Sequence, residues 1–467
     1  MNDITAFFAF LKYCLGYKEN MSKIVAGMDW QELYSFASKQ ALLGLCFEGI
    51  ERLGKEYPEE LRLNPIGREL LMTWMGKAQQ IRRQNMKVNV MAGKLFSMLR
   101  EDGFRCCILK GQGNALMYPN PYSRTPGDID VWVNASREYL TEYAKCHFKL
   151  EDDIRFHHLE TTMGGVPVEL HFFPCSMNNP LYHARLQKWF KRNADLQCSN
   201  VVSLPDGAGD IAIPTSAFNV VYQLTHLYHH FFDEGIGMRQ IIDYFLVVND
   251  FSKNVFLDTD LSNHPVNFSN HPVPLSKEGS TFSPSPSSSG SGDVTAPSRC
   301  SEPLRSKDGG ASKPSPNCAG WDRRDAIGDI ASDASVSSAF TTDSSASTAL
   351  DVVQRELKYL GLWKFAGAVM YVLHETLGLS EEKMIAPMDE KRGKLLLAEI
   401  LNGGNFGRHF TKYGHFTQQG MAKKYFLKIW RNMHFVRFYP AEVLSEPIFR
   451  TWHFFWRLRW DFTYRLR

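Results

Sequence analysis

Two aspartates separated by a single residue are the most chemically suggestive feature of the sequence. Asp128 and Asp130 lie in the segment Gly-Asp-Ile-Asp-Val-Trp-Val, residues 127–133, whose apolar residues indicate a buried strand. Side chains at i and i+2 of a strand project to the same face, so these carboxylates would lie side by side and repel each other. A divalent cation would make that arrangement favourable, whereas an exposed turn with Asp130 facing water would need none. The local sequence leaves both interpretations open.

A third carboxylate strengthens the metal interpretation. Glu169 lies in the largely apolar segment Pro-Val-Glu-Leu-His-Phe, residues 167–172, which follows a predicted hairpin turn at 162–166. If the two strands are neighbours, three carboxylates converge and supply oxygen ligands for one or two Mg²⁺ ions. The alternative is an ion pair between Glu169 and an arginine across the sheet.

The elements that must position these residues form a small α/β unit between helical regions. Helical periodicity dominates residues 1–100, and a short buried strand is predicted at 104–109. The predicted organisation is an N-terminal helical region at 1–100, a core with mixed strands at 101–213, and a C-terminal helical domain made of 214–251 and 350–467. Between the two parts of that domain, residues 252–349 are rich in Ser, Pro, Gly and Asp. We expect a disordered insertion there, because such a composition buries too little apolar surface to offset its conformational entropy.

Composition excludes some classes of function. A chain of 467 residues with 44% hydrophobic and 22% charged residues is typical of a soluble globular protein with more than one domain. The net charge of +3 gives no argument for a membrane surface, and a nucleic-acid partner is not favoured. No run approaches the roughly 18 apolar residues of a transmembrane segment. The N-terminus lacks a basic region ahead of its first apolar stretch, so we expect a cytoplasmic protein.

Several separate segments resemble one known family. They are Leu109-Lys110-Gly111, Tyr118-Pro119, Arg124 leading to Asp128-Ile129-Asp130, Val168-Glu169-Leu170-His171, residues 237–243 and residues 403–407. The sequence is similar in these segments to the uncharacterised bacterial nucleotidyltransferase family of the polymerase-β-like superfamily. The resemblance implies an α+β fold, with a polymerase-β-like nucleotidyltransferase core around a small mixed sheet of five strands. Helical regions would flank that core on both sides.

The resemblance also implies roles for individual residues. Asp128, Asp130 and Glu169 would be catalytic and would hold Mg²⁺, with Mn²⁺ as a second candidate cation. Gly111 and Gly113 would hold the nucleotide's phosphates, Lys110 would contact a phosphate, and Arg124 would neutralise the triphosphate. Gln112 departs from the superfamily's usual Gly-Ser pair, so a serine contact to phosphate is missing.

The resulting hypothesis is a Mg²⁺-dependent nucleotidyltransferase that moves a nucleoside monophosphate from an NTP to an unidentified hydroxyl-bearing acceptor. A small molecule or sugar is the favoured acceptor, because the chain lacks a strongly basic surface signature. One alternative is a non-catalytic nucleotide-binding or regulatory protein. Another is a toxin-like transferase that modifies tRNA or protein.

Four weaker signals have structural interpretations that we favour over functional ones. His226, His229 and His230 lie on one predicted helix, but they lack the glutamate of an HExxH zinc motif, so we expect buried or acceptor-binding histidines rather than a metal site. Arg239 and Asp243 are predicted to form an ion pair at i and i+4. Asn405 suits a turn that needs a positive φ. The aromatic and basic C-terminal segment, 448–467, is expected to pack against the helical domain rather than on a membrane.

Overall fold

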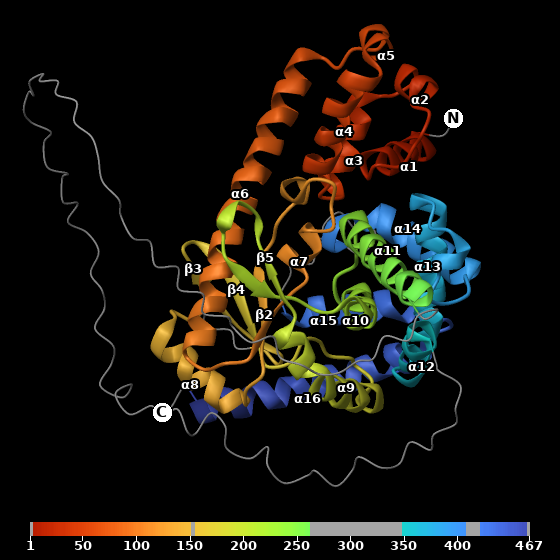
Figure 1. The fold of residues 1–467 in the computed structure, drawn as a ribbon. Coiled ribbons are helices and arrows are strands. Elements are labelled where there is room, and N and C mark those ends of the chain that lie inside the picture. The colour runs from red at the N-terminus through yellow and green to blue at the C-terminus, as the bar shows by residue number, and fades with distance from the viewer. Residues whose placement is uncertain (1–2, 151–154, 262–347, 408–420, 465–467) are drawn as a thin grey trace, which may run out of the picture.

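The computed structural model describes residues 3–150, 155–261, 348–407 and 421–464 (Figure 1). The architecture is α+β and mostly helical, with one small mixed sheet, as the sequence predicted. The insertion predicted at 252–349 lies outside the described residues from 262 to 347. Residues 252–261 belong to a helix instead, because α11 (Met238–Leu261) extends that far.

Helices form the whole N-terminal part of the chain. They are α1 (Asp3–Cys14), α2 (Ser22–Ala26), α3 (Trp30–Lys39), α4 (Leu43–Glu56), α5 (Pro58–Leu63) and α6 (Arg68–Glu101). The 34-residue α6 runs from this group down along the sheet (Figure 1). Its Trp74 is buried with the N-terminal helices, whereas Leu95 and Leu99 pack against the sheet. One long helix therefore fixes the N-terminal helices relative to the strands.

The main sheet has four strands in the order β1-β2-β4-β3. They are β1 (Cys106–Leu109), β2 (Ile129–Val133), β3 (His158–Met163) and β4 (Val166–His171). β2 and β4 are parallel, and the outer pairs are antiparallel. The expectation of five strands is wrong for the described residues, because β5 (Val201–Ser203) and β6 (Asp210–Ala212) pair with each other in a separate sheet.

The two faces of the main sheet differ in chemistry because side chains alternate along each strand. Val131 and Leu170 face a core that they share with α6 and with α8 (Arg137–His147). Asp130 and Glu169 project to the other face, toward the C-terminal helices. The alternation seen in the sequence thus gives the sheet one apolar face and one face with polar residues.

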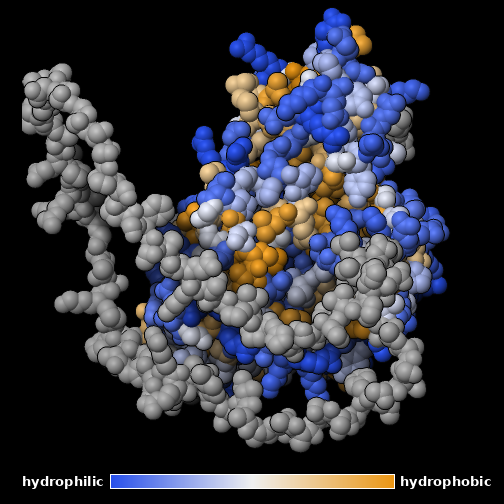
Figure 2. Space-filling view, viewed as in Figure 1, coloured by the Kyte–Doolittle hydropathy of each residue, from blue (hydrophilic) through white to orange (hydrophobic). Residues whose placement is uncertain are grey.

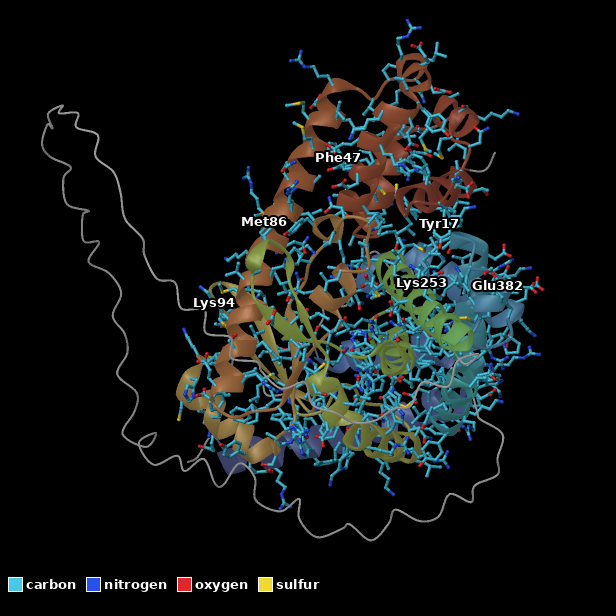
Figure 3. All side chains as sticks on the ribbon, in the orientation of Figure 1. Tyr17, Phe47, Met86, Lys94, Lys253 and Glu382 are labelled. Carbon is cyan, nitrogen blue, oxygen red and sulfur yellow. The ribbon has the colours of Figure 1, made fainter. Side chains whose placement is uncertain are left out.

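The C-terminal half is a second group of helices. It contains α9 (Pro180–Ser199), α10 (Ser216–Asp233), α11, α12 (Ala349–Tyr359), α13 (Trp363–Leu377), α14 (Glu390–Gly403), α15 (Met421–Met433) and α16 (Pro440–Tyr464); the short helices α7 (Gly111–Ala115) and η5 (Asn405–Gly407) complete the site region. The N-terminal helices contact this group directly. Tyr17, which follows α1, packs against Phe245 of α11 with ring centroids 5.8 Å apart (Figure 3 labels Tyr17).

The C-terminal helix α16 makes contacts beyond those that the sequence predicted. Phe156, just before β3, contacts Phe449, Trp452 and Trp456 of α16, with ring centroids 6.0, 5.2 and 5.3 Å away. The guanidinium of Arg137 in α8 lies 4.9 Å from the Trp456 ring. Helix α16 therefore contacts the sheet region through its aromatic side chains, and the helical domain through the ion pair of Arg450 with Asp233 in α10.

The face of the molecule drawn in Figure 2 is largely hydrophilic. Figure 2 shows polar residues over most of the visible face, with hydrophobic ones gathered in its central part. Among the described helices, none combines the length and the apolar character that crossing a bilayer requires.

Candidate active site

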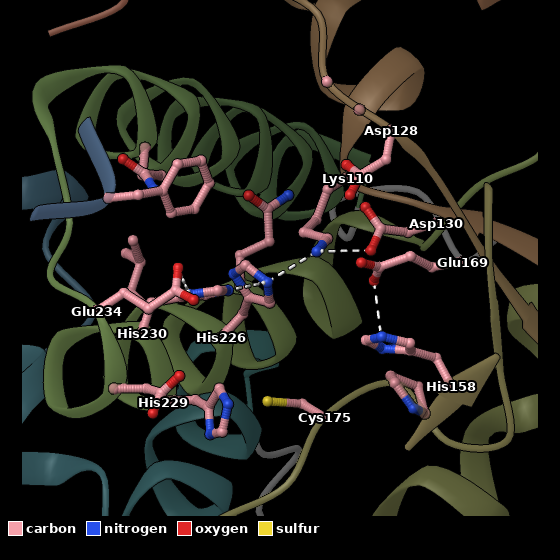
Figure 4. Close-up of a pocket in the computed structure, with 18 of the residues that line it drawn as sticks. Lys110, Asp128, Asp130, His158, Glu169, Cys175, His226, His229, His230 and Glu234 are labelled. Atoms are coloured by element: carbon pink, nitrogen blue, oxygen red, sulfur yellow. Dashed lines mark hydrogen bonds and ion pairs between the residues drawn. The ribbon is translucent and has the colours of Figure 1, made fainter. Parts of the chain in front are cut away.

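A cavity of about 750 Å³ separates the polar face of the sheet from the C-terminal helices. We name its two sides by the residues that line them (Figure 4). The sheet wall comprises Lys110, Gly111, Asp128, Asp130, His158, Glu160, Glu169 and His171. The helix wall comprises His226, His229, His230, Asp233, Glu234, Arg239, Gln240, Asp243, Phe406 and Lys428.

The three predicted carboxylates all lie on the sheet wall. β2 and β4 pair directly, and Asp130 is opposite Glu169 in the register. Asp130 is buried, while the Glu169 side chain keeps 23% of its surface exposed to the cavity. Asp128 lies beside Asp130 in Figure 4. In the described part of the chain no basic side chain forms an ion pair with Asp128, so a cation could still be accommodated there.

The two aspartates have different proton affinities. Burial, together with the charges of Asp130 and Glu169, raises the pKa of Asp128 to about 7. Burial also acts to raise the pKa of Asp130, but Lys110 and His171 hold it well below its usual range. At neutral pH Asp130 is therefore ionised, whereas Asp128 carries a proton part of the time unless another cation approaches.

Two histidines contact the third carboxylate. His171 Nε2 lies 3.0 Å from Asp130 Oδ1 and 3.1 Å from Glu169 Oε2, and His158 Nδ1 lies 3.3 Å from the same Glu169 oxygen. Burial lowers the pKa of His171, but hydrogen bonds to Asp130 and Glu169 outweigh it and raise the pKa to about 9. The imidazolium therefore donates to both carboxylates.

The donor set of the sheet wall fits a divalent cation. Asp130, Glu169 and His171 offer ligand atoms that lie within 4.8 Å of one another. Carboxylate oxygens suit Mg²⁺ and Mn²⁺, and an imidazole nitrogen suits Mn²⁺ better than Mg²⁺. The contact of His171 with both carboxylates was not predicted, although its position two residues after Glu169 on one strand face was visible in the sequence.

Lys110 lies between the two walls. Its Nζ is 3.0 Å from Asp130 Oδ1 and 2.7 Å from His226 Nε2, which is 3.0 Å from His230 Nε2 (Figure 4). The backbone of Lys110 has a φ of +51°, an uncommon conformation for a residue with a side chain. In this structure the amine therefore compensates a carboxylate and links the sheet wall to the helix wall.

The predicted phosphate turn is only partly in the cavity. Gly111, with a φ of +34°, lines the cavity. Gly113 packs against Ile213, where an added Cβ would come within 3.0 Å of the Ile213 side chain. Gln112 is buried and donates a hydrogen bond to Asn89. The position of Gly113 thus serves packing and gives no support for contact with phosphate.

Arg124 does not have the surroundings that the sequence suggested. Its Nε and Nη2 donate to the two carboxylate oxygens of Asp243 at 2.9 and 2.8 Å, and both side chains are buried. Tyr118 also donates to Asp243, at 2.8 Å. Because the bidentate face of Arg124 is occupied by Asp243, the arrangement speaks against the predicted bidentate contact with a triphosphate.

Two local predictions on the helix wall are wrong. Asp243 pairs with Arg124 rather than with Arg239, whose Nη1 donates to the Thr125 carbonyl at 3.0 Å. The positive φ values in the 403–407 turn occur at Gly404, Phe406 and Gly407, and not at Asn405. For Asp243, a residue far away in the sequence displaces the local partner.

The histidines of α10 remain neutral. Burial and nearby positive charges lower the pKa of His226, and they lower the pKa of His230 to about 3. Among the described residues, the groups of three candidate metal ligands consist of sheet-wall residues and the neighbouring His157, and none includes a residue of the helix wall. The interpretation of these histidines as buried, non-metal residues is consistent with this placement.

Comparisons with known proteins identify the family of the chain. No curated protein matches the chain. A crystal structure of an antigenic nucleotidyltransferase-like protein from Paracoccidioides brasiliensis is similar at 15% identity over 38% of this chain and 90% of that chain, with a TM-score of 0.24. Residues 26–262, half of the chain, match the family described as uncharacterised nucleotidyltransferase. The chain belongs to this nucleotidyltransferase family.

Proposed function

We propose that the protein is a Mg²⁺-dependent nucleotidyltransferase that transfers a nucleoside monophosphate from an NTP to a hydroxyl-bearing acceptor. The observation that carries this proposal is the pairing of β2 with β4, which sets Asp130 opposite Glu169 on one wall of a cavity. Family membership supports transferase chemistry. The cavity, about 750 Å³ in volume, has the size of a site for small ligands.

The residues of the sheet wall would have separate roles in metal binding and phosphate binding. Asp128, Asp130 and Glu169 would hold the cation, with Mn²⁺ as a second candidate, and His171 would either join them or keep Glu169 in place. A bound divalent cation would supply Lewis acidity for the acceptor hydroxyl and for the departing pyrophosphate. Lys110 would exchange its contact with Asp130 for one with a phosphate, since its charge is no longer needed when a cation is bound.

We favour a small molecule or a sugar as the acceptor. The nearly balanced net charge supports this preference, since proteins that bind nucleic acids usually carry a strong basic patch. The cavity also has protein on both sides, which suits a ligand smaller than a folded macromolecule.

The test is label transfer from each α-labelled NTP to a cell extract, with Mg²⁺ or Mn²⁺, by the wild-type protein and by Asp130→Ala. We expect transfer with the wild type and none with the variant. Asp195→Asn is the matched control, because this exposed carboxylate pairs with Arg105 outside the cavity. Transfer that survives Asp130→Ala would overturn the site, and wild-type protein without transfer or metal-dependent NTP binding would favour a non-catalytic role.

A further inference from the structure

A buried guanidinium that forms no ion pair within the described residues lies on the helix wall. Arg239, in the first turn of α11, is only 8% exposed. Its Nη1 donates to the Thr125 carbonyl, but its Nε has no hydrogen-bond partner in the part of the chain that the structure describes. No carboxylate of the described residues forms an ion pair with Arg239, since Asp243 is occupied by Arg124.

A second buried donor lies next to this guanidinium. Gln240 is 7% exposed, and its Oε1 accepts a hydrogen bond from the Gly237 N–H at 2.7 Å. Among the described residues the Nε2 of Gln240 has no hydrogen-bond partner, and both Arg239 and Gln240 line the cavity. The ring of Phe406, 5.5 Å from the Arg239 guanidinium, covers one side of it. Burying a charge and a polar donor without partners is costly, so an anion in the cavity would stabilise this arrangement.

The position of Arg239 indicates which anion that is. Its contact with Thr125 brings it to the loop that ends at Asp128, three residues further along the chain. Burial and the charge of Arg124 lower the pKa of Arg239, and Asp243 and Asp128 act in the opposite direction. A metal-bound triphosphate at Asp128 and Asp130 would therefore extend toward Arg239.

We propose that Arg239 and Gln240 bind the terminal phosphates of the NTP. This inference rests on the proposed function and gives Arg239 the role that the sequence suggested for Arg124. A guanidinium and an amide side by side offer several N–H donors to phosphate oxygens, and the guanidinium adds a charge. The phosphates would lie between the divalent cation bound at the sheet wall and the guanidinium of Arg239 on the helix wall.

The test measures the affinities of each NTP, of AMP and of inorganic tripolyphosphate, all with Mg²⁺, by isothermal titration calorimetry. Tripolyphosphate reports on the subsite without depending on the preferred base. Arg239→Gln should weaken binding of NTP and tripolyphosphate by about 10- to 100-fold and leave AMP nearly unchanged. Arg239→Lys should fall in between, since it keeps the charge but not the planar donors.

Two further variants control for folding and for charge. Gln240→Glu keeps the acceptor for the Gly237 N–H and supplies a carboxylate to the cavity, so it should also weaken tripolyphosphate binding while remaining folded. Lys428→Gln removes a cation from the same wall, but this cation is already paired with Asp233 at 2.7 Å. It should leave the preference for NTP over AMP unchanged.

The outcomes separate this inference from the proposed function. Arg239-dependent binding of tripolyphosphate without any label transfer would defeat the proposed function and keep the phosphate subsite. Label transfer with an unchanged NTP preference in folded Arg239→Gln would keep the function and overturn the subsite. A wild-type protein that does not bind tripolyphosphate at all would also overturn it.

Discussion

The two walls of the cavity differ in how completely their charged side chains form ion pairs. On the sheet wall, Asp130 pairs with Lys110 and His171, Glu169 shares His171, and Asp128 has no ion pair among the described residues. On the helix wall, Asp243 pairs with Arg124, and Asp233 pairs with both Lys428 and Arg450. Within the described residues, Asp128 is therefore a carboxylate without an ion pair on the sheet wall, and Arg239 is a cation without one on the helix wall.

This difference indicates which groups bind ligands and which hold the fold. Paired buried charges resist exchange, because removing one partner leaves the other uncompensated. Charged groups that share a partner, or have none, are stabilised most when an ion of opposite charge enters the cavity. A metal-bound triphosphate would compensate the charges of both walls, because its cation would bind the carboxylates and its phosphates would bind Arg239.

The largest effect is expected where a buried pair is broken. Arg124→Gln should destabilise the protein by about 3–5 kcal/mol, since Asp243 would remain buried without its guanidinium. Urea denaturation measures the change, and Arg124→Gln combined with Asp243→Asn should recover part of it. If Arg124→Gln were as stable as the wild type and lost NTP affinity instead, Arg124 would be a phosphate ligand after all.

The sheet wall has its own matched pair of carboxylates. Glu169→Gln should slow nucleotide transfer by more than about 100-fold, because a proposed metal ligand loses its charge. Glu160→Gln should cost less than about tenfold, since Glu160, opposite Glu169 in the register, pairs with Arg155 and His158. Initial rates of label transfer give both values. Equal losses in the two variants would contradict the assignment of Glu169.

The strands of the sheet wall could be predicted because they depend on short-range patterns in the sequence. Alternation in the segments around Asp130 and Glu169 predicts two strands, and the hairpin turn places the second one. Strand β2 occupies Ile129–Val133 as expected, and the fold class is confirmed. The fifth strand, taken from the family resemblance, was wrong for the described residues.

The helix wall was not predictable from one sequence. Arg124 and its partner Asp243 are 119 positions apart, so the local pairing of Asp243 with Arg239 was the more obvious choice. Lys110 and His226 are 116 positions apart, and their contact depends on how α10 packs against the sheet. The His226 and His230 spacing was visible, but spacing alone cannot name the third group that they contact.

The packing of α6 against the loop between β5 and β6 leaves no room for an added methyl group at Gly93. Gly93 of α6 packs against the Ala208 carbonyl of the loop between β5 and β6, and a Cβ at Gly93 would overlap that oxygen. Gly93→Ala should therefore destabilise the protein by about 1–3 kcal/mol. Gly76→Ala, on the same helix with open space around it, should stabilise by about 0.5–1 kcal/mol. Thermal denaturation compares them, and a stabilising Gly93→Ala would show that the loop moves away freely.

Acid should affect the helix wall before the sheet wall. Burial, His229 and Lys110 lower the pKa of His230 to about 3, so between pH 6.5 and 3 the unfolded chain binds a proton at this residue that the folded protein does not. Stability from His230 is present above pH 6.5 and is lost as the pH falls. For Asp130, whose pKa is also lowered, the loss begins only below its unfolded value of about 4.

His230→Gln should therefore flatten the dependence of unfolding free energy on pH by about 1 kcal/mol per pH unit between pH 6 and 4. Gln keeps a group that can hydrogen bond to His226 but does not titrate. His147→Gln, on the exposed end of α8, controls for the loss of a histidine as such. Urea denaturation at half-unit pH steps gives both slopes. An unchanged slope in His230→Gln would show that this imidazole is already protonated in the folded protein, and the helix wall would then carry a second cation beside Arg239.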